Sequence, residues 1–186
     1  MPDPLHPIVV HFPIVLAILL PFITVGALWA IRIGAKPMRA WSVAIAFGAA
    51  LTASAVVAEK TGEQQEDRVE HVVNESRVEA HAEAAEALVV ASVVVLVVLA
   101  AGLVPGTAGL AARYAAVLGA LVVAVMVFRV GMTGGDLVYK YNAASAYASP
   151  GGGGSSTTEA SASADGADKR ERGEKGESGG KDDDDK

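Results

Sequence analysis

Residues 84–104, with the sequence AAEALVVASVVVLVVLAAGLV, decide the fold, because they hold one charged residue, Glu86, and one other polar side chain, Ser92. A helix in a soluble protein needs polar residues on its solvent face, and this run offers almost none. Its length matches the roughly 20 residues that a helix needs to cross a bilayer. The many valines do not argue for a strand, because a lone segment in lipid must pair its backbone polar groups internally. The run therefore predicts a membrane-spanning helix.

Three further stretches have the same apolar composition and similar length, namely residues 9–33, 38–58 and 110–130. Polar turns separate them from one another. We expect Pro21 to kink the first span near its middle. The second span is rich in small residues that let helix backbones approach closely: Gly48, Ala49, Ala50, Ala53 and Ala55. We therefore predict an all-α fold, a four-helix transmembrane bundle that occupies residues 1–147.

The segment between the second and third spans is charged rather than apolar. Valines nevertheless recur in residues 59–83 at helical spacing, at positions 69, 72, 73 and 78. We expect an amphipathic extramembrane helix here that continues into the third span.

The chain changes character again after Tyr147. Residues 150–156 read as a glycine-serine linker, and the residues beyond them mix Ser, Ala, Gly and charge without an apolar period. Such a composition cannot bury a core, so residues 148–186 are predicted to form a disordered hydrophilic tail. Its ending, DDDDK at residues 182–186, resembles an enterokinase cleavage site and carries no functional weight.

Composition narrows the possible chemistry. The chain has no cysteine, which excludes thiolate metal sites, iron–sulfur clusters and covalently attached haem. Any metal must be held by histidine or carboxylate. No nucleophile with a base and no phosphate-binding loop is present, so the sequence does not indicate an enzyme, and nothing in it suggests binding to nucleic acid. The partners that we expect are the lipid bilayer and a redox partner protein.

The four histidines, His6, His11, His71 and His81, all fall at one end of the predicted bundle. His11 opens the first span and His81 stands about one turn before the third, so the two should lie at similar depth. Imidazoles at matched depth on two helices of a bundle suit the axial ligation of a non-covalent b-type haem. His6 and His71 lie farther out along the chain, although His6 could fold back over the bundle mouth.

Apart from Arg113 at its start, Arg129 is the only charged residue in the last span, and it lies near the same end as the histidines. It could meet a haem propionate, pair with Glu59 or Glu83, or extend to the membrane interface.

The haem hypothesis has two rivals. One is a divalent metal site built from His11 and His81 with His6, His71 and Glu83, since imidazole and carboxylate suit zinc or copper(II). The other is a cofactor-free structural or assembly protein whose histidines are ordinary interfacial residues.

Residues 6–14, HPIVVHFPI, strongly resemble the opening of a bacterial and archaeal membrane family known as domain of unknown function 2231. The resemblance continues through residues 61–69, 78–81 and 134–139, and so covers about residues 5–142. Tyr141 and Asn142 stand where members often carry His-Gly, and Ala82 replaces an acidic residue that usually follows the histidine. Some relatives are fused to cytochrome c modules, so the resemblance implies association with haem or redox chemistry.

The basic residues of the short loops predict the orientation. Arg32, Lys36, Arg39 and Arg113 gather on one side, which should be cytoplasmic. We expect a multi-pass protein of the plasma membrane with both termini and all four histidines outside. A reporter that works only in the cytoplasm should be inactive when fused after Tyr147 and active when fused in the loop at Lys36. The reverse pattern would invert the topology.

Overall fold

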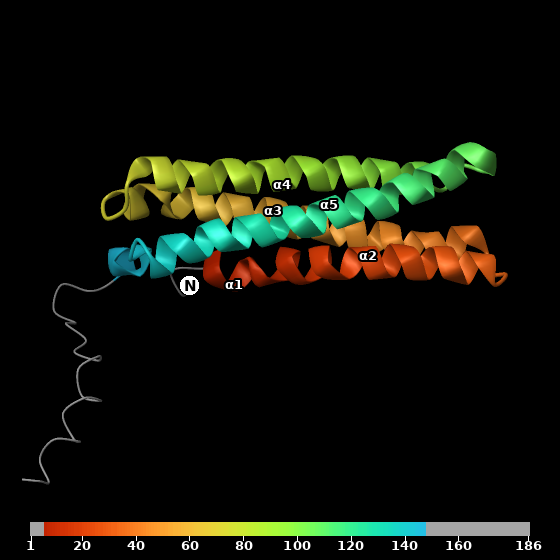
Figure 1. The fold of residues 1–186 in the computed structure, drawn as a ribbon, viewed down its shortest axis with the longest axis horizontal. Coiled ribbons are helices and arrows are strands. Elements are labelled where there is room, and N and C mark those ends of the chain that lie inside the picture. The colour runs from red at the N-terminus through yellow and green to blue at the C-terminus, as the bar shows by residue number, and fades with distance from the viewer. Residues whose placement is uncertain (1–5, 148–186) are drawn as a thin grey trace, which may run out of the picture. The chain divides into compact units, whose positions relative to one another are not determined.

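The computed structural model describes residues 6–147, and the predicted tail at 148–186 lies outside the described residues. Every regular element in this range is helical, and the prediction of an all-α, four-helix bundle is confirmed (Figure 1). The elements are the short helix α1 (His6–Val9), the four long helices α2 (His11–Arg32), α3 (Pro37–Glu70), α4 (Glu75–Ala101) and α5 (Gly106–Tyr139), and the 3-10 helix η1 (Ala143–Tyr147).

The four long helices form a closed ring in chain order. Each packs on two neighbours, and no Cα atom comes within 8 Å of one on the diagonally opposite helix. One end of the bundle, which we call the histidine end, holds α1, the turn between α3 and α4, and the C-terminal end of α5 (Figure 1). The other end, the basic end, holds the α2–α3 and α4–α5 connections.

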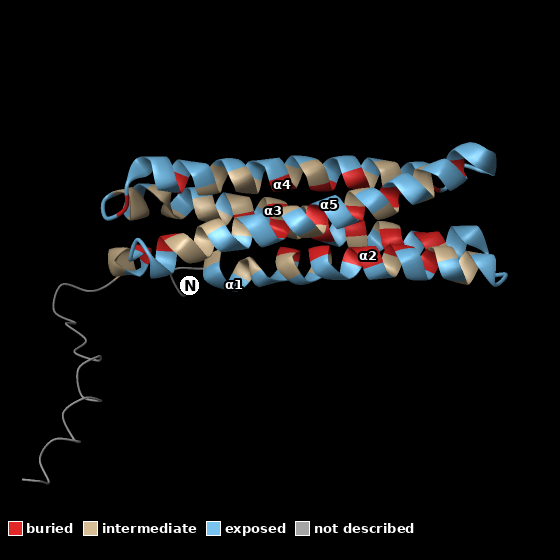
Figure 2. Ribbon diagram, in the orientation of Figure 1, coloured by how far each residue is buried: buried red, intermediate tan, exposed pale blue. Residues whose placement is uncertain are grey.

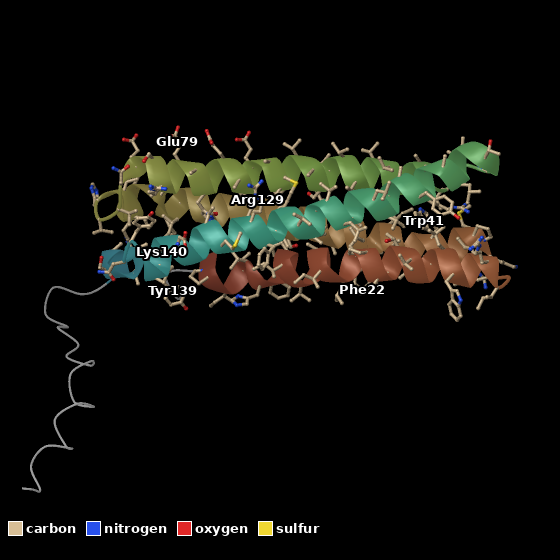
Figure 3. All side chains as sticks on the ribbon, in the orientation of Figure 1. Phe22, Trp41, Glu79, Arg129, Tyr139 and Lys140 are labelled. Atoms are coloured by element: carbon tan, nitrogen blue, oxygen red, sulfur yellow. The ribbon has the colours of Figure 1, made fainter. Side chains whose placement is uncertain are left out.

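The bundle has small side chains inside and large apolar ones outside. Alanine is frequent in the buried core, whereas Phe22, Trp29 and Phe128 are largely exposed. Figure 2 shows that the outward faces of the long helices are mostly exposed, and Figure 3 shows Phe22 on one of them. All four long helices are long and apolar enough to cross a bilayer. Such an apolar exterior is stable only in hydrocarbon, so the exposed surface is the lipid-facing surface of a membrane protein.

The charged segment 59–83 is helical, but it is not one helix. Helix α3 continues to Glu70, residues 71–74 form a turn, and α4 begins at Glu75. Asn74 causes this break, because its side chain accepts a hydrogen bond from the Ser76 N–H (3.0 Å) and caps α4. The segment thus forms the end of α3 and the beginning of α4, and it carries both helices beyond their apolar parts. Glu79 points away from the bundle there (Figure 3).

Pro21 lies buried inside α2, which runs through it without a break. The hydroxyl of Thr24 donates a hydrogen bond to the Pro21 carbonyl (2.9 Å) in the same buried region. Proline removes the helical hydrogen bond to the carbonyl four residues earlier, that of Ala17, so the Thr24 bond adds to the pairing of the helix and does not replace the lost bond.

A polar anchor joins three helices at the basic end. The indole N–H of Trp41 on α3 donates to the Leu99 carbonyl on α4 (2.8 Å), and Trp41 is fully buried. Arg113 of α5 donates to the Gly102 carbonyl (2.7 Å) and lies over the Trp41 ring, 5.8 Å from its centre. The tryptophan fits only because residue 102 has no side chain, since a Cβ there would stand 2.3 Å from the indole nitrogen.

Gly102→Ala should therefore destabilise the bundle. Overpacking of this kind costs about 1–3 kcal/mol of unfolding free energy. Gly26→Ala is the matched control, because no atom lies within 4 Å of a Cβ at that position. Thermal unfolding in detergent, followed by circular dichroism, should show a lower Tm for Gly102→Ala and no loss for Gly26→Ala. Equal Tm values would contradict the anchor.

Candidate functional site

Helical phase, and not depth alone, decides which histidines enter the bundle. The buried positions of α2 include Pro13, Leu20 and Ala27, which recur every seven residues. One further step of seven toward the N-terminus reaches His6, which is partly buried. His11 stands two residues before Pro13 and hence about 200° around the helix from it at 100° per residue. It is exposed on the outside of the bundle.

His6 is held by the helix that returns beside it. Its Nδ1 atom lies 2.9 Å from the Ala58 carbonyl oxygen and 3.2 Å from the Thr61 hydroxyl oxygen, both on α3. A carbonyl can only accept, so Nδ1 carries the proton and donates to Ala58. Nε2, the other ring nitrogen, has no hydrogen-bond partner among the described residues. The imidazole is therefore fixed at one nitrogen and open at the other.

His81 on α4 is held in the same way by α5. Its Nδ1 atom lies 2.9 Å from the hydroxyl oxygen of Thr133. The hydroxyl hydrogen of Thr133 is already donated to the Val130 carbonyl (3.0 Å), so the threonine accepts and His81 Nδ1 donates. Within the described part of the chain, Nε2 of His81 also lacks a hydrogen-bond partner.

A glycine packs against each imidazole. A Cβ at Gly62 would lie 3.1 Å from Cε1 of His6, and one at Gly134 would lie 3.0 Å from Cε1 of His81. His6, Gly62, His81 and Gly134 form what we call the histidine layer. The two histidines come from opposite corners of the ring of helices and the two glycines from the other corners. The imidazoles are close enough for an electrostatic interaction between them.

The histidine layer lies between two apolar clusters. The main core follows it toward the basic end and reaches up to Leu88 and Val127. A smaller cap cluster closes the histidine end and consists of Val73, Val78, Leu137 and Ala143, with Val69 packed against them. Polar side chains held between two apolar clusters are largely shielded from water, which strengthens any electrostatic interaction or coordination there.

The layer is built from two similar halves. In one hairpin His6 of α1 meets Ala58, Thr61 and Gly62 of α3, and in the other His81 of α4 meets Thr133 and Gly134 of α5. The hydrogen bonds from His6 to Ala58 and from His81 to Thr133 both span 52 residues. Two Thr-Gly pairs after the second and fourth spans were the sequence signal of this site.

The structure does not bring the other predicted ligands to the layer. His11, His71 and Glu83 are exposed, so the expected pairing of His11 with His81 does not form. The reason is that the number of residues along a helix predicts the depth of a side chain but not the direction in which it points. No group of three or more His, Cys, Asp or Glu within residues 6–147 is arranged to hold a metal ion.

Arg129 is exposed on α5. It lines a shallow surface hollow of ≈ 580 Å³ together with Asp136 and Lys140, which pair with each other at 2.8 Å. No salt bridge joins Arg129 to Glu59 or Glu83. This position agrees with a side chain that extends to the membrane interface.

Four apolar helices around an interior histidine pair define a polytopic membrane protein. The family model described as "Predicted membrane protein (DUF2231)" matches residues 2–146, and the chain belongs to that family. No curated protein and no solved structure matches the chain.

The hydrogen bonds predict how each imidazole responds when its threonine is removed. Thr133→Val should release His81, because Thr133 is its hydrogen-bond acceptor, whereas Thr61→Val leaves His6 bound to the Ala58 carbonyl. In ¹⁵N NMR of the labelled protein, His6 and His81 should both show the proton on Nδ1. Thr133→Val should perturb the His81 signals strongly, and Thr61→Val should change those of His6 less. A proton on Nε2 of either ring in the wild type would contradict the assignment.

Proposed function

We propose that this protein binds one b-type haem non-covalently between His6 and His81 and passes electrons near the outer face of the plasma membrane. The observation that carries the proposal is that the two imidazoles are held in the same way. Each is fixed through Nδ1 and leaves Nε2 without a hydrogen-bond partner among the described residues. Ligands of iron commonly donate the other ring N–H to a carbonyl or similar acceptor, which sets the tautomer and ring orientation.

The surrounding residues suit a planar cofactor. The ligand pair comes from opposite corners of the bundle, and glycine occupies the other two corners of the layer, where each glycine packs against the Cε1 side of one imidazole. A bis-histidine haem supplies a site for a single electron. The chain's own contribution is to orient the two rings through Ala58, Thr61 and Thr133 and to keep water out with the two apolar clusters.

The charges at the two ends support an orientation with the histidine end outside. Arg32, Lys36, Arg39 and Arg113 lie at the basic end, which the positive-inside rule puts in the cytoplasm. The histidine end instead exposes carboxylates, among them Glu63, Asp67, Glu75, Glu79 and Glu83. A redox partner protein with a basic face would be attracted to this surface.

A transition-metal ion is the second candidate for the same two nitrogens. Imidazole suits zinc and copper, but the wider ligand set of His11, His71 and Glu83 is not gathered around the pair. Metal analysis of the purified protein separates this candidate from haem.

The absorption spectrum tests the proposal. Protein produced with added haem should show a Soret band and, on reduction, the split bands of a six-coordinate low-spin haem. His6→Ala or His81→Ala should abolish or convert this spectrum, whereas His11→Ala and His71→Ala should leave it unchanged because both side chains are exposed.

A rescue experiment separates ligation from folding. His6→Gly removes the ring, and added imidazole should restore the six-coordinate spectrum if His6 is an axial ligand. An unaltered spectrum in both His6→Ala and His81→Ala would disprove the ligand pair. A wild-type protein that binds zinc or copper at one equivalent and never binds haem would establish the metal candidate instead.

A further inference from the structure

The hollow beside Arg129 at the histidine end carries more positive than negative charge, and we call it the polar hollow. Its volume is ≈ 580 Å³, and Arg129, Asp136 and Lys140 line it. Asp136 is the one carboxylate in the lining that the described residues form, and it is already paired with Lys140 at 2.8 Å. Two cations and one anion leave one positive charge in excess. A single phosphodiester group would neutralise this excess.

Arg129 is the residue of the polar hollow that is best placed to bind an anion. Between residues 6 and 147, no hydrogen bond or salt bridge engages its guanidinium. This group carries five N–H donors, and its planar fork binds the oxygens of a phosphate two at a time. Lys140 gives one of its three donors to Asp136 and adds positive potential nearby. The polar hollow therefore suits a phosphate that is bound mainly by Arg129.

The polar hollow lies at the depth of the lipid headgroups. The apolar run 110–130 ends one residue after Arg129, and the other lining residues follow it. Tyr139 lines the hollow and is 90% exposed, as is typical of tyrosines in the interfacial belts of membrane proteins. A headgroup layer of roughly 5–8 Å borders each face of the hydrocarbon core. An arginine at this boundary can reach the phosphates of the surrounding lipid.

A second hollow, which we call the apolar groove, lies between α2 and α5 nearer the middle of the spans. Its volume is ≈ 690 Å³, and large apolar side chains such as Phe22 line it together with Leu121. Gly26 also lines it, and no atom of the described residues lies within 4 Å of a Cβ built there. The missing side chain leaves this part of the groove open. The groove therefore suits an acyl chain.

The polar hollow and the apolar groove follow one side of α5. Leu121 of the groove and Tyr139 of the hollow are 18 residues apart, which is five turns at 3.6 residues per turn. They therefore share one line along the helix. Leu121 lies eight residues from Arg129, or about 12 Å at 1.5 Å per residue. Half of the hydrocarbon core is about 15 Å thick, so one lipid in the leaflet at the histidine end can occupy both hollows.

We propose that a phospholipid with a singly charged, anionic headgroup binds along α5. Its phosphate lies at Arg129 in the polar hollow, and one acyl chain lies in the apolar groove. An anionic headgroup fits better than a zwitterionic one, because the ammonium group of the latter would meet two cations and a carboxylate that already holds Lys140. The bound lipid would fill the surface between the first and last spans. The site goes beyond the proposed function, because it needs neither haem nor the two Nε2 atoms.

Native mass spectrometry of the full-length protein tests the headgroup contact. Protein in detergent is mixed with equal amounts of phosphatidylglycerol and phosphatidylcholine that carry the same oleoyl chains. The wild type should retain one phosphatidylglycerol in preference. Arg129→Gln should lower this preference on the order of tenfold, the loss expected when a charge-assisted hydrogen bond is removed. An unchanged preference would overturn the site.

Lys60→Gln is the matched control, because Lys60 is an exposed cation at the same end of the bundle and does not line the polar hollow. It should retain the lipid as the wild type does, and an equal loss in both variants would replace the site by a general effect of charge. An excess of inorganic phosphate should not displace the lipid from the wild type, because a free ion lacks the acyl chain. Displacement would show a site for small anions and overturn the lipid.

Gly26→Leu tests the apolar groove. The added side chain should lower the retention of dioleoyl phosphatidylglycerol severalfold, but not that of the dihexanoyl lipid, whose short chains do not reach the groove from Arg129. Ala50→Leu is the control, because Ala50 is equally exposed in the membrane but lies on α3, which does not line the groove. Retention of the dioleoyl lipid at the wild-type level by Gly26→Leu would reject the groove. Circular dichroism melts show that each variant is folded.

Discussion

Hydrocarbon offers no hydrogen-bond partner, and this constraint governs the arrangement of every polar group in the bundle. Thr24 and Ser92 each donate to a carbonyl of their own helix, and Trp41 donates to a carbonyl of the next one. The two histidines obey the same constraint at Nδ1 and depart from it at Nε2. An imidazole that is satisfied on one side only is the exception that a ligand site requires, because a fully paired ring could not bind anything.

The spans could be predicted from the sequence because the length of an apolar run is set by the thickness of the bilayer. This signal needs no knowledge of packing, and it gave the number and order of the helices. The break at residues 71–74 was harder to see, because valine spacing continues on both sides of it and only the cap at Asn74 stops α3 from joining α4. Boundaries set by one side-chain hydrogen bond are weakly encoded in composition.

The residues of the histidine layer were predicted only in part, and the exposed position of His11 shows why. Counting residues along a helix gives the depth of a side chain, and depth selected His11 and His81. The direction of a side chain depends on which face of the helix is buried. The first span carries large apolar residues on every face, so its sequence did not show which face that is. The seven-residue spacing of Pro13, Leu20 and Ala27 leads to His6, but His6 stands five residues before His11 with Pro7 between them, so the sequence placed it farther out. The glycines that adjoin the rings carried a sequence signal, a Thr-Gly pair in each hairpin, but only the packed helices show which ring each glycine contacts.

The two halves of the site have a thermodynamic consequence. Each imidazole is hydrogen-bonded within its own hairpin, so neither half-site helps to hold α1 to α5, and no Cα atom of α1 lies within 8 Å of one of α5. A ligand bound to both Nε2 atoms would add a link between the hairpins, which also pack on each other through α3 with α4 and through α2 with α5. A ligand that binds the folded state alone stabilises it by about 2.7 kcal/mol at a free concentration of 100 times its Kd. A ligand that bridges the two unpaired nitrogens would therefore tie the two hairpins to each other at the level of the histidine layer.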